Sequence, residues 1–318
     1  MKIGNKVLIV IVAVVGLYAA FLIGSDINTI YDKISYFKIE YIPIILPLVS
    51  SGWFVLFFRW HLLLQNAKIS IPVKDSFLIL ASGFAVTIIP GKVGELVKSQ
   101  LLKTKFGIAR SKTVPIVILE QFYSAVGIVA LSFFGIWYFE LGAYVLGFFT
   151  AALAFAVILL LSRKTFNKIV LLLEKKRFTS KFVEPLSSSY DGIKNGIKGP
   201  IVLYASSLSM LFWVIEAVTI YFILLAFGVE VIEFLTIVST YTTSIMLGIL
   251  SFLPLGLGVV EGTLASFFVI QGIEVSLSLT IVVVIRLFTR WYTVSFGFIA
   301  LKFSGGLTDN KESNDSKP

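Results

Sequence analysis

The chain contains no cysteine, one histidine and few charged residues. Of its 318 residues, 14% are Asp, Glu, Lys or Arg and 57% are hydrophobic, and the mean hydropathy is +0.95. The lack of cysteine excludes disulfides and thiolate chemistry, although it does not identify a compartment. So little charge excludes an ordinary soluble domain of this length, and the composition predicts a polytopic membrane protein.

Other absences exclude several kinds of chemistry. The sequence has no GxxxxGK[ST] loop, so we do not expect ATP hydrolysis. With one His, no Cys and no close cluster of Asp or Glu, we expect no metal site and no cofactor. His61 follows Arg59 and Trp60, and we interpret this group as an interfacial boundary rather than a catalytic one. We therefore predict that the chain is not an enzyme.

The net charge of +9 is concentrated between the apolar runs. Such an excess suggests nucleic acid in a soluble chain, but in a membrane protein it marks loops that face an anionic leaflet. We therefore expect no nucleic-acid partner, a location in the cell (plasma) membrane, and both termini in the cytoplasm. Segment 163–199, with nine Lys or Arg, is the main predicted cytoplasmic loop, and 304–318 is predicted to be a disordered tail.

Six apolar runs are long enough to cross a bilayer as α-helices, because about 20 residues at about 1.5 Å each span the hydrocarbon core. The first run, 7–24, carries no charge. We interpret it as a retained anchor, with a cleaved signal peptide as the alternative. The other five predicted spans are 41–58, 113–139, 141–161, 200–227 and 276–301.

Two further apolar runs are interrupted by proline, glycine and glutamate. The breaks read Ile89-Pro90-Gly91-Lys92-Val93-Gly94-Glu95 and Leu253-Pro254-Leu255-Gly256-Leu257-Gly258-Val259-Val260-Glu261. Proline removes a backbone donor and glycine weakens a helix, so protein rather than lipid must surround both breaks. We predict re-entrant or broken hairpins of two half-helices at 72–102 and 234–271, with 234–253 crossing fully as the alternative for the second. The predicted hinge residues are Pro90, Gly91, Gly94, Pro254, Gly256 and Gly258.

The two hairpins indicate an internal repeat. The breaks lie 164 residues apart, and each is followed by a short half-helix, a polar connection and a long span with a charge near its middle. Three full spans lie between them, and this odd number makes the hairpins enter from opposite faces, as in an inverted-topology repeat. We predict a single transmembrane domain, 1–303, with repeat units at about 41–161 and 200–303.

Three cations near the breaks, Lys92, Arg286 and Arg290, predict a binding site for an anionic headgroup. The N-termini of half-helices attract anions, and Arg286 and Arg290 lie four residues apart, on one face of a helix. In the alternative, the glycines only permit close packing and the arginines only neutralise Glu120 or Glu216. We predict that these two glutamates form buried ion pairs.

Glu95 and Glu261 lie in the first turns of the two half-helices and have two interpretations. A carboxylate there is a good helix cap and dipole partner. It could also titrate, because burial raises a carboxyl pKa, so that proton binding opens one side of the membrane domain. Both carboxylates would also repel an anionic substrate.

The paired motifs resemble those of the flippase-like membrane domain of lysylphosphatidylglycerol synthases, approximately Pro-Gly-Arg-x-Gly-Glu and Pro-Gly-Gly-x-Gly-x-x-Glu. Lys92 replaces the arginine of the first pattern and Leu255 a glycine of the second. After Glu120 the family often has Arg and then Asp, where this chain has Gln121 and Ser124. Arg286 sits like the arginine of the final family helix. The resemblance covers about 1–303.

In full-length synthases a separate soluble domain transfers lysine to the lipid, so the resemblance implies a lipid-handling membrane protein without that activity. We predict a membrane lipid translocase for an anionic or lipid-linked headgroup, with a membrane lipid as ligand and a separate synthase or glycosyltransferase as a partner. A membrane-embedded lipid or isoprenoid transferase and a non-transporting accessory subunit of a glycosyltransferase are the alternatives.

Overall fold

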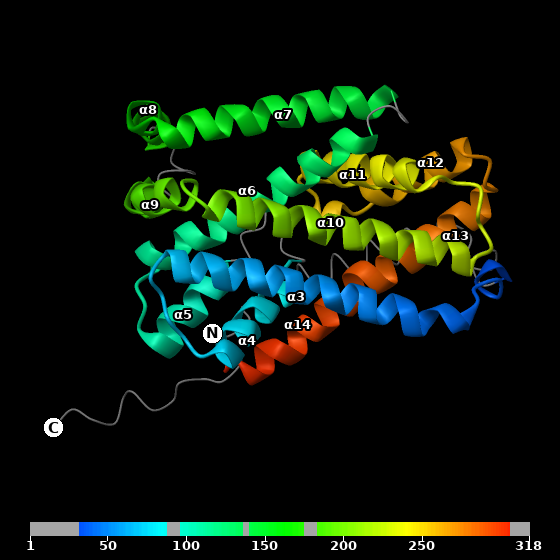
Figure 1. Ribbon diagram of the computed structural model, residues 1–318, viewed down its shortest axis with the longest axis horizontal. Helices are drawn as coiled ribbons and strands as arrows, with labels where there is room; N and C mark the ends of the chain where they lie inside the picture. The colour runs from blue at the N-terminus through cyan, green and yellow to red at the C-terminus, as the bar shows by residue number, and fades with distance from the viewer. Residues whose placement is uncertain (1–31, 88–95, 136–139, 175–182, 306–318) are drawn as a thin grey trace.

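The computed structural model describes residues 32–87, 96–135, 140–174 and 183–305, which fold into helices and connecting turns (Figure 1). Within these ranges, five helical segments are long and apolar enough to cross a membrane. They are Ile39–Asn66, Arg110–Phe134, Gly142–Leu159, Ile201–Ala226 and Val275–Phe303. The prediction of an all-α polytopic membrane protein is confirmed. The predicted first span, 7–24, lies outside the described residues.

Helix α3 (Ile42–Asn66), which follows the short 3-10 helix η1 (Ile39–Tyr41), corrects one prediction. It continues beyond Phe58, and Arg59 and Trp60 are only 3% and 0% exposed. Their interpretation as an interfacial boundary is wrong, because the helix carries both residues into the protein interior. His61 is half-buried, with Nδ1 3.3 Å from the Ser76 hydroxyl.

Short helices occupy both predicted hairpins. The first consists of α4 (Val73–Ala85) and α5 (Val97–Phe106), and its break, 88–95, lies outside the described residues. The second consists of α11 (Phe234–Leu250), the 3-10 turn η5 (Pro254–Gly256) and α12 (Val259–Ile270). Pro254 and the glycines therefore interrupt the second run as expected.

The last span contains a local irregularity that its hydropathy did not indicate. Helices α13 (Val275–Arg286) and α14 (Tyr292–Phe303) are joined by a π-helical turn, η6 (Leu287–Trp291). Hydrogen bonds in such a turn run from i to i+5, and single π turns inside α-helices occur frequently at functional sites. The α-helical spacing assumed for Arg286 and Arg290 is interrupted here.

The described parts of the polar segment 163–199 are largely helical. They form α8 (Arg163–Glu174) and α9 (Val183–Gly196), which follow the long helices α6 (Arg110–Gly135) and α7 (Glu140–Leu161). Helix α9 packs closely on α6, since a Cβ atom at Gly196 would lie 2.1 Å from Leu119 Cδ1. The Tyr123 hydroxyl donates to the Gly196 carbonyl at 2.6 Å.

Two large hydrophobic clusters form the interior. One joins α3, α4, α5, the first half of α6 and α14, and the other joins α10 (Ile201–Ala226) to α11, α12, α13 and the second half of α6. Helix α3 packs along α10, and α4 packs along α14, whereas α7 lies at the outer edge of the bundle (Figure 1). The interiors of α4 and α11 are almost wholly buried, so protein covers these two helices. The second break itself is partly exposed at Phe252 and Leu253, and the first break lies outside the described residues.

Candidate functional site

A cavity of about 470 Å³ lies between the two hydrophobic clusters. Its wall includes residues of both hairpins, such as Phe84 of α4 and Gly248 of α11, together with residues of α3, α6, α10 and η6. This volume is within the range of small-molecule sites. The cavity is therefore where the two predicted repeat units meet.

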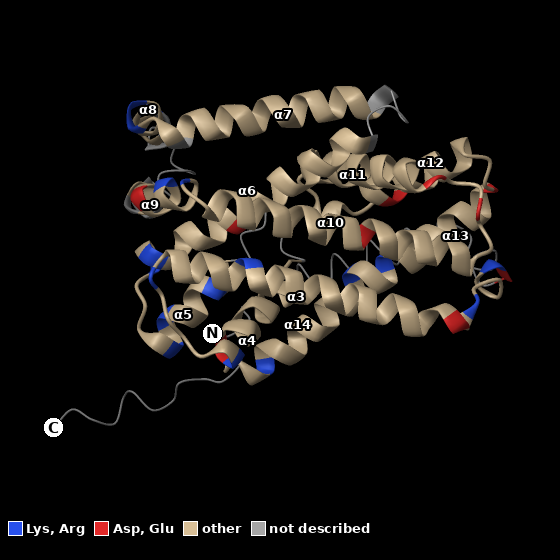
Figure 2. Ribbon diagram, viewed as in Figure 1, with Lys and Arg blue, Asp and Glu red and all other residues tan. Residues whose placement is uncertain are grey.

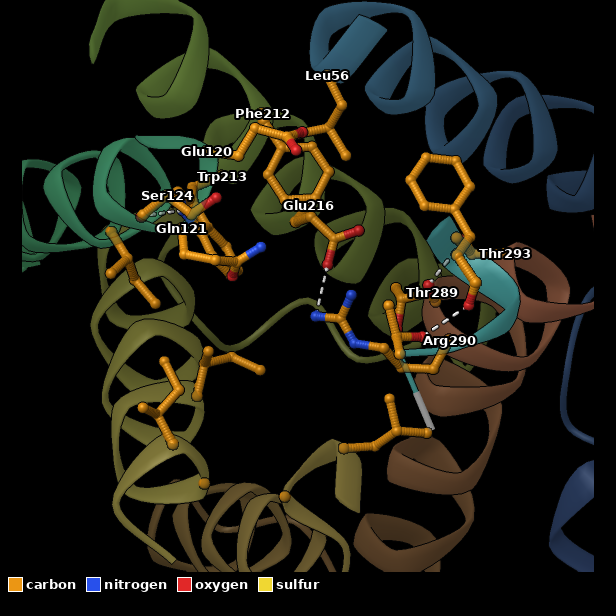
Figure 3. A pocket seen from close by; sticks show the side chains of 18 of the residues that line it. Leu56, Glu120, Gln121, Ser124, Phe212, Trp213, Glu216, Thr289, Arg290 and Thr293 are labelled. Atoms are coloured by element: carbon orange, nitrogen blue, oxygen red, sulfur yellow. Dashed lines mark hydrogen bonds and ion pairs between the residues drawn. The ribbon is translucent and has the colours of Figure 1, made fainter. Parts of the chain in front are cut away.

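Arg290 enters the cavity from the π-helical turn (Figure 3). Its Nη2 atom lies 3.1 Å from Glu216 Oε2 and donates to the Tyr241 hydroxyl at 2.9 Å. The Tyr241 hydroxyl in turn donates to the same Glu216 oxygen. Both contacts of the guanidinium use Nη2, so Nε and Nη1 have no hydrogen-bond partner among the described residues. Nη2 is therefore held, while the N–H groups of Nε and Nη1 remain available.

Arg286 has a different environment, although it is only four residues away. Its Nε donates to Glu261 Oε1 and its Nη2 to the Leu255 carbonyl oxygen, both at 2.6 Å, and the side chain is 3% exposed. The other Glu261 oxygen accepts the Gly258 backbone N–H at 2.7 Å. Glu261 thus caps α12 and forms a buried ion pair, and this Arg286–Glu261 clamp holds the second break from two sides.

Glu120 forms the second fully buried ion pair of the described residues. Its Oε2 atom lies 2.5 Å from Lys98 Nζ, and each side chain is 3% exposed. The Lys98 ammonium also lies 5.2 Å from the centre of the Trp60 ring. Both predicted glutamates, Glu120 and Glu216, are buried beside a cation, which is Lys98 for Glu120 and Arg290 for Glu216.

Arg59 is a cavity-lining cation that the sequence interpretation assigned elsewhere. Its Nη1 donates to the hydroxyls of Ser124 at 3.0 Å and Ser209 at 2.8 Å. Gln121 and Ser124, the two departures from the family pattern, also line the cavity (Figure 3). An arginine inside an otherwise apolar helix was the available signal, because intramembrane charge is costly and usually functional.

The remaining predicted site residues divide into two groups. Pro90, Gly91, Lys92, Gly94 and Glu95 lie outside the described residues, so their roles stay predictions. Gly256 and Gly258, by contrast, adopt φ angles of 67° and 80°, which only glycine adopts readily. In the ranges that the structure covers, no three His, Cys, Asp or Glu side chains come together as a metal site.

Comparison with known proteins gives one family and several relatives. Residues 7–297 match the model of the lysylphosphatidylglycerol synthase TM region. Two UPF0104 membrane proteins of Methanothermobacter thermautotrophicus are 31% and 32% identical, over 35% and 36% of this chain. These alignments span 32% and 38% of the two relatives' own lengths. A UPF0104 membrane protein of Methanocaldococcus jannaschii is 26% identical over 68% of this chain and 92% of its own length.

Proposed function

Because this chain belongs to the family of the lysylphosphatidylglycerol synthase TM region, we propose that it is a lipid translocase. It moves a lipid with an anionic, phosphate-bearing headgroup between leaflets, through the cavity between the two hairpins. The chain itself carries out no covalent chemistry, and a separate synthase or glycosyltransferase supplies or uses the lipid.

The unengaged N–H groups of Arg290 are the observation that carries this proposal. A guanidinium presents five N–H donors in a planar fork that fits phosphate, and here only Nη2 is engaged. Glu216 and Tyr241 fix the orientation of the fork, so Nε and Nη1 are available to an anion in the cavity. Arg286 does not line the cavity and both its contacts are to the second break, so in this proposal it positions that break rather than binding substrate.

The contacts between helices support an inverted repeat. If α3, α4, α5 and α6 correspond to α10, α11, α12 and α13–α14, the contact of α4 with α14 corresponds to that of α11 with α6. Likewise the contact of α5 with α6 corresponds to that of α12 with α13, and α3 packs on its own counterpart α10. Both proposed units line the cavity, as expected for a site between two inverted repeats whose access side alternates.

The distribution of charge supports a cytoplasmic location for both termini in the cell membrane. Lys and Arg predominate at the end of the bundle where α5, α8 and α9 lie (Figure 2). At the other end, the loops before α11 and before α13 contain Glu230, Glu233 and Glu274. Orientation follows Lys and Arg in short loops, so the end with α8 and α9 faces the cytoplasm.

A transport assay in phosphatidylcholine vesicles tests the proposal. Phosphatidylglycerol added to the outer leaflet is oxidised at its vicinal diol by external periodate, so the accessible fraction reports movement inward without a label. The protein should lower this fraction faster than empty vesicles do. Arg290→Gln should slow the movement about tenfold or more, because a charge-assisted hydrogen bond is worth about 1.5–3 kcal/mol and about 1.4 kcal/mol is tenfold.

Two further variants keep the result interpretable. Arg290→Gln alone leaves Glu216 buried beside a neutral side chain, so Glu216→Gln with Arg290→Gln removes the whole ion pair. Arg163→Gln, which changes an exposed arginine outside the cavity, should leave the rate unchanged. Movement no faster than in empty vesicles, or movement equally fast in the double variant, would refute the proposal.

A further inference from the structure

Among the described residues that line the cavity, the exposed ones lie together, at the end of α11 and in the turn after it. Ile249, Phe252 and Leu253 all line the cavity and are 39%, 79% and 46% exposed. They are apolar and adjacent, and we call them the apolar lip. The cationic group of Arg290 and the apolar lip therefore belong to the same cavity.

The backbone holds the apolar lip in a costly conformation. Phe252 and Leu255 have φ angles of 54° and 53°, in the left-handed region that L-residues other than Asn and Asp rarely adopt. The exposure of Phe252 also gives it little packing in return. An exposed aromatic side chain on a strained backbone indicates a role that packing within the chain does not explain.

Several contacts fix the apolar lip in place. The Ser251 hydroxyl donates to the Gly248 carbonyl at 2.7 Å and accepts the Leu253 N–H at 3.2 Å. On the other side, Arg286 holds the Leu255 carbonyl at 2.6 Å. The Arg286–Glu261 clamp thus positions the apolar lip relative to the cavity, even though neither charged side chain lines it.

We infer that the apolar lip binds the hydrocarbon chain of the ligand, and that the ligand is recognised as an amphiphile rather than as a free anion. This inference rests on the proposed function. A cavity of about 470 Å³ accommodates a headgroup, and a lipid whose headgroup lies at Arg290 must leave its chains outside. The apolar lip provides the surface along which they leave, because it is the exposed apolar part of the same cavity wall.

The experiment compares a lipid with its chainless headgroup in the same vesicles. Periodate accessibility follows phosphatidylglycerol, and radiolabelled glycerol phosphate inside the vesicles follows the water-soluble headgroup. We expect the protein to move the lipid and to leave glycerol phosphate at the leak rate of empty vesicles. Phe252→Ser together with Leu253→Ser should slow lipid movement at least fivefold. The single variant Phe252→Leu, which keeps an apolar side chain, should move the lipid at about the wild-type rate.

Phe252→Gly separates the proposed role from a structural one. Glycine adopts a φ of 54° without strain, so this variant should keep or raise the melting temperature while lowering the transport rate. Leu203→Ser is the matched control, because Leu203 is 69% exposed on α10 and does not line the cavity. It should leave the transport rate unchanged.

The outcomes distinguish the two proposals. If the wild-type protein moves neither probe, the proposed function fails. If lipid movement depends on Arg290 but is unaffected by Phe252→Gly and by the double serine variant, the apolar lip has no such role. Equal movement of glycerol phosphate and lipid would also overturn the inference. The inference would also be overturned if substitutions in the apolar lip changed the oligomeric state but not the transport rate, because the surface would then bind protein.

Discussion

Replacing Arg286 with methionine should destabilise the protein substantially. Glu261 is fully buried, and the substitution leaves its carboxylate with the Gly258 N–H but without its cation. Removing one partner of a buried ion pair costs about 3–5 kcal/mol. At about 2 °C per kcal/mol for a long chain, the melting temperature should fall by about 6–10 °C. Glu261→Met should have a similar effect, because it leaves the guanidinium buried alone.

A double-mutant cycle tests whether the two residues act together. Residues in one ion pair typically show a coupling energy of about 0.5–3 kcal/mol. The variant with both methionines should therefore lower the melting temperature by less than the sum of the two single changes. Thermal unfolding followed by tryptophan fluorescence in one detergent provides the four values.

A surface pair serves as the control for this cycle. Lys33 and Glu274 lie 2.6 Å apart, but Glu274 is 60% exposed, so Lys33→Met should shift the melting temperature far less. If the Arg286 and Glu261 changes add without coupling, or if either alone has no larger effect than Lys33→Met, the clamp does not hold the second break.

Two further predictions concern packing and pH. Gly297→Ala should lower the melting temperature by about 2–6 °C. Its Cβ atom would lie 2.3 Å from the Ala85 backbone nitrogen, and overpacking costs about 1–3 kcal/mol. Gly147→Ala, with open space around it, should be neutral or stabilising. The hydrogen bond from Lys33 lowers the pKa of Glu274 below its usual 4.5, and that to Glu274 raises the pKa of Lys33 above 10.5. The pair therefore stabilises the fold fully between these two usual values and is lost as pH falls through the lowered pKa or rises through the raised one. A difference in melting temperature between wild type and Glu274→Gln at pH 7 should consequently disappear in acid; a difference that persists there would contradict this assignment.

Local chemistry made the architecture predictable from sequence. Long apolar runs marked the spans, and proline and glycine marked the second break, because both act on the backbone where they stand. The helix-capping interpretation of Glu261 also depended only on its position in the first turn of α12. The structure has its side chain in that position, accepting the Gly258 N–H.

Pairings between distant helices could not be predicted in the same way. The second span was predicted to end at its first charged residue, so Arg59 was assigned to an interface. In the structure Arg59 instead contacts Ser124 and Ser209 inside the bundle. Tyr241 was one of several hydroxyl side chains in its run, and its contact with Glu216 depends on how α10 and α11 pack. Nothing in the local sequence indicates which side of a long helix will meet which neighbour.

The π-helical turn has a consequence for the angular phase of the last span. Helix α13 belongs to one hydrophobic cluster and α14 to the other, so each half must present its own side to different partners. A residue added to an α-helix turns everything beyond it by about 100°, because a full turn takes about 3.6 residues. The π-helical turn Leu287–Trp291 therefore sets the rotation of α14 relative to α13. With this rotation Arg286 contacts α12 while Gly297 contacts α4.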